Sequence, residues 1–149
     1  MKEPLIFFMV FLLVLSTGFA VNAIIQSYRL IHSSGSFKRV GVEIWDGYAK
    51  ANRLDHVEWG EINLNKQNYS TVDIYIESTS TKRIALRIFV NETDPATLFD
   101  WMALTTDYEG MPINPGEIIQ VTLRLTIDDH IPWSINPFNF DIWIIGEPS

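Results

Sequence analysis

The longest strict alternation of apolar and polar residues in the chain is Ile119-Gln-Val-Thr-Leu-Arg-Leu-Thr-Ile127. Its aliphatic residues fall on one side of an extended chain, and its threonine and arginine residues fall on the other. A period of two residues is typical of a strand that buries one face. The segment therefore predicts a β-strand, and Asn114-Pro-Gly-Glu117 before it predicts the turn that leads into it.

Shorter segments with the same period lie on both sides of this strand. They are residues 40–45, 56–62, 71–77, 83–90, 103–108 and 138–145. The pattern favours one short helix over residues 94–102, where Asp94 precedes Pro95. Short strands separated by turns predict an all-β fold, a single immunoglobulin-like antiparallel β-sandwich of about 7–8 strands.

The N-terminal segment is almost wholly apolar from Leu5 to Ile25. As a helix it would be long enough to cross the hydrocarbon core of a bilayer, about 30 Å thick. It also has the features of a signal peptide, with small residues that suit cleavage after Ala20 or Ala23. We favour a retained anchor because the apolar run is long for the core of a signal peptide.

These patterns divide the chain into three parts. We expect residues 1–31 to be a transmembrane anchor, which would be an N-terminal helix, or a signal segment. Residues 32–39 include Ser33-Ser-Gly-Ser36, a composition typical of a flexible linker. Residues 40–149 are expected to form the extracytoplasmic domain, on the cell membrane if the leader is retained and secreted if it is cleaved.

Composition limits the classes of function. The chain carries a net charge of −7, and residues 40–149 contain 17 acidic and 7 basic residues. Such a domain does not suit nucleic acid, since phosphate contacts need a basic face. The chain has no cysteine, which excludes disulfides, thiolate nucleophiles and copper centres with a thiolate ligand. Candidate N-glycosylation sites at Asn68 and Asn91 are consistent with an exported domain.

Some aromatic and aliphatic residues fall where a polar residue is expected. Trp143 and Ile145 would point outward from the last strand, and Trp133 lies in a loop that contains two prolines. Exposed apolar side chains of this kind are typical of an interaction surface. We expect self-association, contact with other surface proteins, or glycan binding through the available tryptophans.

No motif for catalysis stands out. The three histidines have no metal-binding spacing, and no nucleophile elbow, phosphate loop or dinucleotide fingerprint is present. Asp128-Asp129-His130, together with Asp107 and Glu109, would offer oxygen ligands to calcium. A solvated acidic loop is the simpler interpretation. We therefore expect a non-enzymatic protein without a cofactor or a bound metal.

The order of the segments resembles that of the TasA/camelysin-like β-sandwich surface proteins and related archaeal pilus and fibre subunits. The resemblance is carried by Gly41-Val-Glu-Ile-Trp45, Val57-Glu-Trp-Gly-Glu-Ile62, Val72–Glu77, Pro115-Gly-Glu117 before Val121-Thr-Leu123, and Phe138-Asn-Phe-Asp-Ile142. It covers most of residues 40–145. Residues 63–68 depart from it, because another Pro-Gly pair is expected there. The resemblance implies a structural surface protein whose subunits exchange a strand to build a fibre.

Three functional hypotheses remain. The first is an exported structural or interaction protein, either anchored through residues 5–25 or assembled into fibres. The second is an accessory module that binds a protein or a glycan. The third is a filament component of the type IV pilin or archaellum kind, although Met1-Lys-Glu-Pro4 lacks the processing signal of that class.

Overall fold

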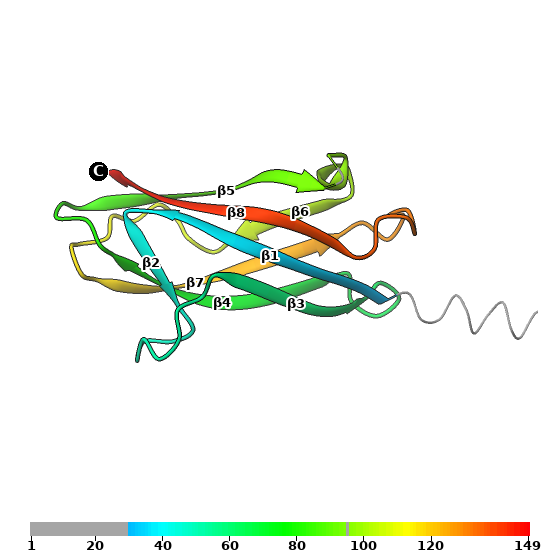
Figure 1. Ribbon diagram of the computed structural model, residues 1–149, viewed down its shortest axis with the longest axis horizontal. Helices are drawn as coiled ribbons and strands as arrows, with labels where there is room; N and C mark the ends of the chain where they lie inside the picture. Colours follow the sequence, from blue (N-terminus) through cyan, green and yellow to red (C-terminus); the bar gives the residue numbers. More distant parts are fainter. Residues whose placement is uncertain (1–29, 95) are drawn as a thin grey trace, which may run out of the picture.

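The computed structural model describes residues 30–94 and 96–149, which form eight strands and one short helical turn (Figure 1). The elements are β1 (Leu30–Val40), β2 (Val42–Trp45), β3 (His56–Asn63), β4 (Tyr69–Ser78), β5 (Ile84–Asp94), the 3₁₀ turn η1 (Leu98–Asp100), β6 (Met102–Thr106), β7 (Ile118–Ile127) and β8 (Phe138–Pro148). The described chain is therefore all-β, as the alternating patterns predicted.

The strands form two four-stranded sheets. One has the order β3-β1-β8-β5, and the other has the order β2-β4-β7-β6. Every pairing is antiparallel except that of β1 with β8, which is parallel from Ser33 beside Phe138 to Val40 beside Ile145. The expectation of a purely antiparallel sandwich is thus corrected for this one pair.

A single hydrophobic core lies between the sheets. Alternate residues of β7 and β8 are buried, including Leu123, Leu125, Ile142 and Ile144, each with 0% exposure. The long alternation that predicted β7 thus marks the buried face correctly. The two sheets share this one cluster of apolar side chains, so the described residues form one layered domain.

Strand β1 is the main difference from the sequence-based expectation. Residues 32–39 were predicted to be a linker, yet they form most of a central strand between β3 and β8. Along β1, Ile31, Ser33, Gly35 and Phe37 point inward, and the intervening residues are exposed or half-buried. A Cβ on Gly35 would lie 3.3 Å from side-chain atoms on both neighbouring strands, so the small residues fit a tight position.

The boundary of the domain therefore moves from residue 40 to Leu30. Gly41, with φ of +72°, separates β1 from β2 and lets the chain pass from one sheet to the other. The short helix expected over residues 94–102 is reduced to η1, because β5 continues to Asp94. Residues 30 and 31, the end of the predicted anchor segment, belong to β1 instead. The rest of that segment and the cleavage positions Ala20 and Ala23 lie outside the described residues. Within residues 30–94 and 96–149, no helix is long and apolar enough to cross a membrane.

Candidate interaction surfaces

An apolar patch lies on the outer face of the β3-β1-β8-β5 sheet. The register places Val40 beside Ile145 and Phe89 beside Trp143. The rings of Phe89 and Trp143 stack with centroids 6.2 Å apart and an interplanar angle of 15°. Val40 is 53% exposed, whereas Trp143 and Ile145 are half-buried. Trp143 and Ile145 therefore belong to an outward patch, as their position in the alternation predicted.

Charged side chains on the same face are paired with one another. Lys38 lies 3.7 Å from Asp141, and Arg87 lies 3.5 Å from Glu147. The Arg87 guanidinium also lies 4.9 Å from the centre of the Phe89 ring. Because its cations are matched by carboxylates within the patch, this surface has no marked preference for a partner of either charge.

Trp133 lies on a different surface, in the loop that joins β7 to β8. The loop is held by Ile131 and Ile135, which are 1% and 6% exposed, while Trp133 between them is 60% exposed. Turn hydrogen bonds from the Ile131 N–H to the Asp128 carbonyl and from the Ile135 N–H to the Pro132 carbonyl, each 3.1 Å, define the path of the loop. Trp133 is thus presented outward from a loop with a fixed backbone.

The side chain of Asn136 fastens this loop to the beginning of β1. Its Nδ2 donates to the Leu30 carbonyl at 3.0 Å, and its Oδ1 accepts from the His32 N–H at 3.1 Å. The pairing of β1 with β8 begins at Ser33. Just before that point, the Asn136 side chain supplies β1 with the hydrogen bonds that a neighbouring backbone would otherwise supply. We call these two bonds the Asn136 clamp. They place the Trp133 loop next to the residue where the chain enters the domain.

The candidate calcium ligands do not form one group. Asp128, Asp129 and His130 lie together, with their ligand atoms within 4.8 Å of one another, and all three are exposed. Hydrogen bonds from the His130 N–H and ring lower the pKa of Asp128 from its usual value. Asp107, in contrast, accepts a 2.8 Å bond from the Thr122 N–H. Thr122 and Asp128 are six residues apart in sequence, which corresponds to about 20 Å along an extended strand. Asp107 therefore lies far from the Asp128 group.

Two open clefts are present at opposite ends of β7. One, of about 370 Å³, is lined by Asn68, Asp100, Trp101, Met102, Ala103, Thr126, Ile127, Asp128 and Asp129. The other, of about 380 Å³, is lined by Asp107, Tyr108, Glu109, Met111, Pro112, Ile113, Glu117, Ile119 and Gln120. Each combines carboxylates with apolar side chains, and neither brings one of the three histidines to a candidate nucleophile.

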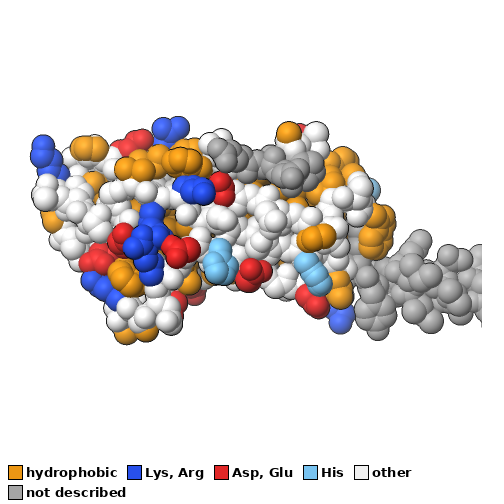
Figure 2. Space-filling model, in the orientation of Figure 1, with side chains coloured by type: hydrophobic (Ala, Val, Ile, Leu, Met, Phe, Trp, Pro, Cys, Tyr) orange, Lys and Arg blue, Asp and Glu red, His pale blue; other side chains and the backbone are white. Residues whose placement is uncertain are grey.

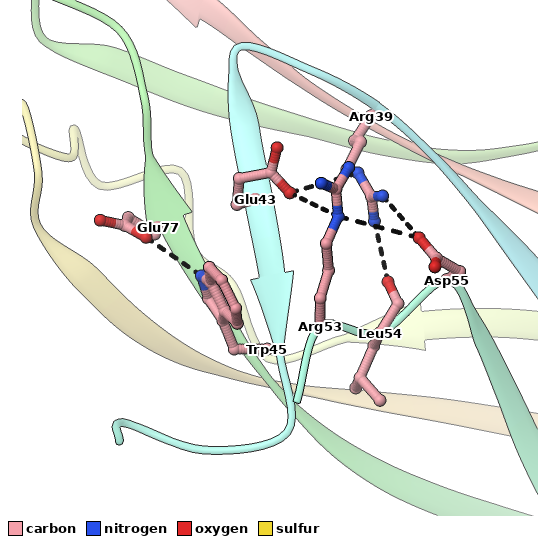
Figure 3. Close-up of polar contacts among 7 residues, drawn as sticks. All are labelled: Arg39, Glu43, Trp45, Arg53, Leu54, Asp55 and Glu77. Atoms are coloured by element: carbon pink, nitrogen blue, oxygen red, sulfur yellow. Dashed lines mark hydrogen bonds and ion pairs between the residues drawn. The ribbon is translucent and has the colours of Figure 1, made fainter. Parts of the chain in front are cut away.

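A network of charged side chains fixes the other end of β1 (Figure 3). Arg39 donates to the Leu54 carbonyl at 2.9 Å and to the Asp55 carboxylate, and its Nε lies 3.4 Å from Glu43. Arg53 Nε lies 2.9 Å from the same Glu43 oxygen. The contacts of Arg39 and Arg53 with this oxygen are ion pairs without hydrogen-bond geometry. The Arg39 hydrogen bond lowers the pKa of Asp55. The network holds the loop between β2 and β3 against β1, so its role is structural.

The two candidate glycosylation sites are both accessible. Asn68 is exposed in the β3–β4 turn, and its carbonyl accepts from the Ile127 N–H at 2.8 Å. Asn91 is exposed on β5, opposite Asp141 of β8. A glycan at either amide nitrogen would point away from the core, and whether one is attached stays a prediction.

Comparison with known proteins does not assign the chain to a family. No protein-family model and no curated protein matches its sequence. The surfaces described above are therefore the basis for any statement about function.

Proposed function

We propose that this chain is a non-enzymatic, exported cell-surface protein whose immunoglobulin-like sandwich is held at the outer side of a membrane by residues 5–25. One observation carries the proposal. The sandwich begins at Leu30, and only four residues separate it from Ile25, where the apolar run ends. A domain joined so closely to a hydrophobic segment would be held at the bilayer surface if that segment is retained.

The surfaces of the sandwich support a structural or interaction role. The outer patch around Trp143 and the exposed Trp133 offer apolar contact area, which is typical of surfaces that meet a partner. The acidic charge of residues 40–149 suits a solvated domain outside the cell. The partner we expect for the patch is a second copy of the chain or another surface protein.

Membrane extraction and N-terminal sequencing test the anchor. We expect the native protein to remain in the membrane fraction after alkaline carbonate washing, to keep Met1, and to be digested by protease added outside the cell. A mature N-terminus at Val21 or Ile24, with release into the medium, would refute the anchored form. A protein that stays intact on sealed cells but is digested after lysis would refute export.

A strand-exchange fibre is the second candidate, and the position of β1 favours it. This strand is the first of the domain, lies between β3 and β8, and follows the predicted leader in sequence. A subunit whose own β1 is withdrawn would present two strand edges to the β1 of a neighbour. Electron microscopy of the cleaved protein tests this: filaments would support exchange, and particles of one domain each would refute it.

A further inference from the structure

The end of the sandwich that bears Trp133 is also the end where the chain enters. Figure 1 shows the β7–β8 loop, in orange, at the same end of the molecule as the first residues of β1. The Asn136 clamp joins these two segments directly. Figure 2 shows hydrophobic side chains gathered at this end. The location of Trp133 is therefore fixed relative to Leu30.

The length of the intervening chain limits how far this end can be from a membrane. Five peptide steps separate Ile25 from Leu30. A fully extended chain spans at most about 3.6 Å per residue, so Leu30 is within roughly 18 Å of the end of the apolar run. Trp133 is three residues from Asn136 of the clamp, so their backbones are at most about 11 Å apart. The headgroup region is only about 5–8 Å deep on each side of the bilayer, so these lengths allow Trp133 to reach the headgroups and do not by themselves place it there.

We propose that this end of the sandwich docks on a lipid bilayer, with the indole of Trp133 among the headgroups. The inference rests on the proposed anchoring through residues 5–25. Tryptophan suits this position because its ring is apolar and its N–H is polar, which is why it is enriched at membrane interfaces. Ile131 and Ile135 hold the loop, so little conformational freedom is lost when the ring is inserted.

The charges at this end indicate the kind of lipid surface. Asp128 and Asp129, both exposed, belong to the same loop as Trp133. An anionic surface would repel these carboxylates. The docking surface therefore fits a bilayer of zwitterionic lipids better than an anionic one.

Trp143 provides an internal control. It lies beside Lys38, eight residues along β1 from Leu30. At about 3.3 Å per residue, this is about 26 Å farther from the membrane end of the strand. A lipid-phase quencher should reach Trp133 and not Trp143.

The experiment uses the full chain in phosphatidylcholine vesicles, half of which contain lipid brominated in the acyl chains. Flotation on a density gradient first shows whether the protein is bound to the vesicles. Tryptophan emission is then compared between brominated and ordinary vesicles for wild type, Trp133→Phe and Trp143→Phe. The chain contains five tryptophans, so quenching of Trp133 alone would remove about one fifth of the wild-type emission if all five emit equally.

The outcomes separate the inference from the proposed function. Loss of the quenching in Trp133→Phe but not in Trp143→Phe supports docking. Equal quenching in wild type and Trp133→Phe overturns docking, even though flotation still supports the anchor. Failure to float overturns the anchor itself. Protection of Trp133 from aqueous acrylamide in detergent, without bromolipid quenching in vesicles, would mean that a second copy covers the loop, which also overturns docking. Weaker quenching in vesicles with added phosphatidylserine supports the expected lipid preference, and stronger quenching refutes it.

Discussion

Replacement of Phe37 by alanine tests whether β1 is part of the folded domain. Phe37 is 6% exposed and belongs to the core, and its N–H bonds the Asp55 carbonyl at 2.8 Å. Deleting a buried phenylalanine ring costs about 3–5 kcal/mol, because contacts are lost and a cavity remains. A domain of roughly 120 residues has a free energy of unfolding of about 6–18 kcal/mol. The substitution should therefore remove a large part of the stability.

Urea unfolding of the full chain in mild detergent, followed by tryptophan emission, measures the effect. With a slope of about 2 kcal/mol per molar urea, the midpoint of Phe37→Ala should fall by about 1.5–2.5 M. Ser36→Ala is the matched control, because Ser36 is the exposed neighbour on the same strand and its replacement should change stability by no more than about 0.5 kcal/mol. Phe37→Leu keeps most of the side-chain volume and should lie between the two. Equal midpoints for Phe37→Ala and Ser36→Ala would refute the placement of β1 in the core.

Three further predictions concern single contacts. Asn136→Ala removes the clamp of two hydrogen bonds and should cost about 2 kcal/mol, with faster amide exchange at the start of β1; unchanged exchange would contradict the clamp. The hydrogen bond from Arg39 lowers the pKa of Asp55. The stability that this bond contributes is therefore present above the usual carboxyl pKa and is lost as the pH falls through the lowered value. In Arg39→Gln, carbon NMR titration should show the Asp55 pKa rise toward 3.8, and an unchanged pKa would refute the pairing. Gly146→Ala places a Cβ 2.5 Å from the Ile84 Cδ1 and should lower the urea midpoint by an amount that corresponds to about 1–3 kcal/mol; a neutral result would mean that Ile84 has room to move.

The fold was predictable where the alternation was long. In β7, every inward position from Val121 to Ile127 is an aliphatic residue, so its buried face could be read from the sequence. In β1 the inward residues between Ile31 and Phe37 are Ser33 and Gly35, which carry no apolar signal. Tight packing against β3 and β8 requires the small residue at Gly35, and this contact depends on strand pairing that the local sequence does not encode.

The candidate surfaces were predictable only in part. The outward direction of Trp143 follows from the period of its strand, but its partial burial depends on stacking with Phe89 of another strand. Trp133 could be placed in an exposed loop from its flanking prolines. Its position next to Leu30 could not, because the Asn136 side chain joins residues that are more than a hundred positions apart in sequence. Contacts at that separation follow from topology rather than from local propensity.

The anchored and fibre-forming hypotheses make opposite demands on β1. In the described fold β1 fills its own domain, paired with β8 from Ser33 to Val40 and with β3 from Leu30 to Ser36. Exchange would require all of these bonds, the core contacts of Phe37 and the Asn136 clamp to break before they form again in a neighbour. A retained anchor adds a further restriction, since β1 could then reach only a copy held beside it in the same membrane. Cleavage after Ala20 or Ala23 would remove that restriction and leave the barrier set by the core. The stability measured for Phe37→Ala therefore bears on both hypotheses, because the larger the contribution of β1 to its own domain, the slower its exchange into another.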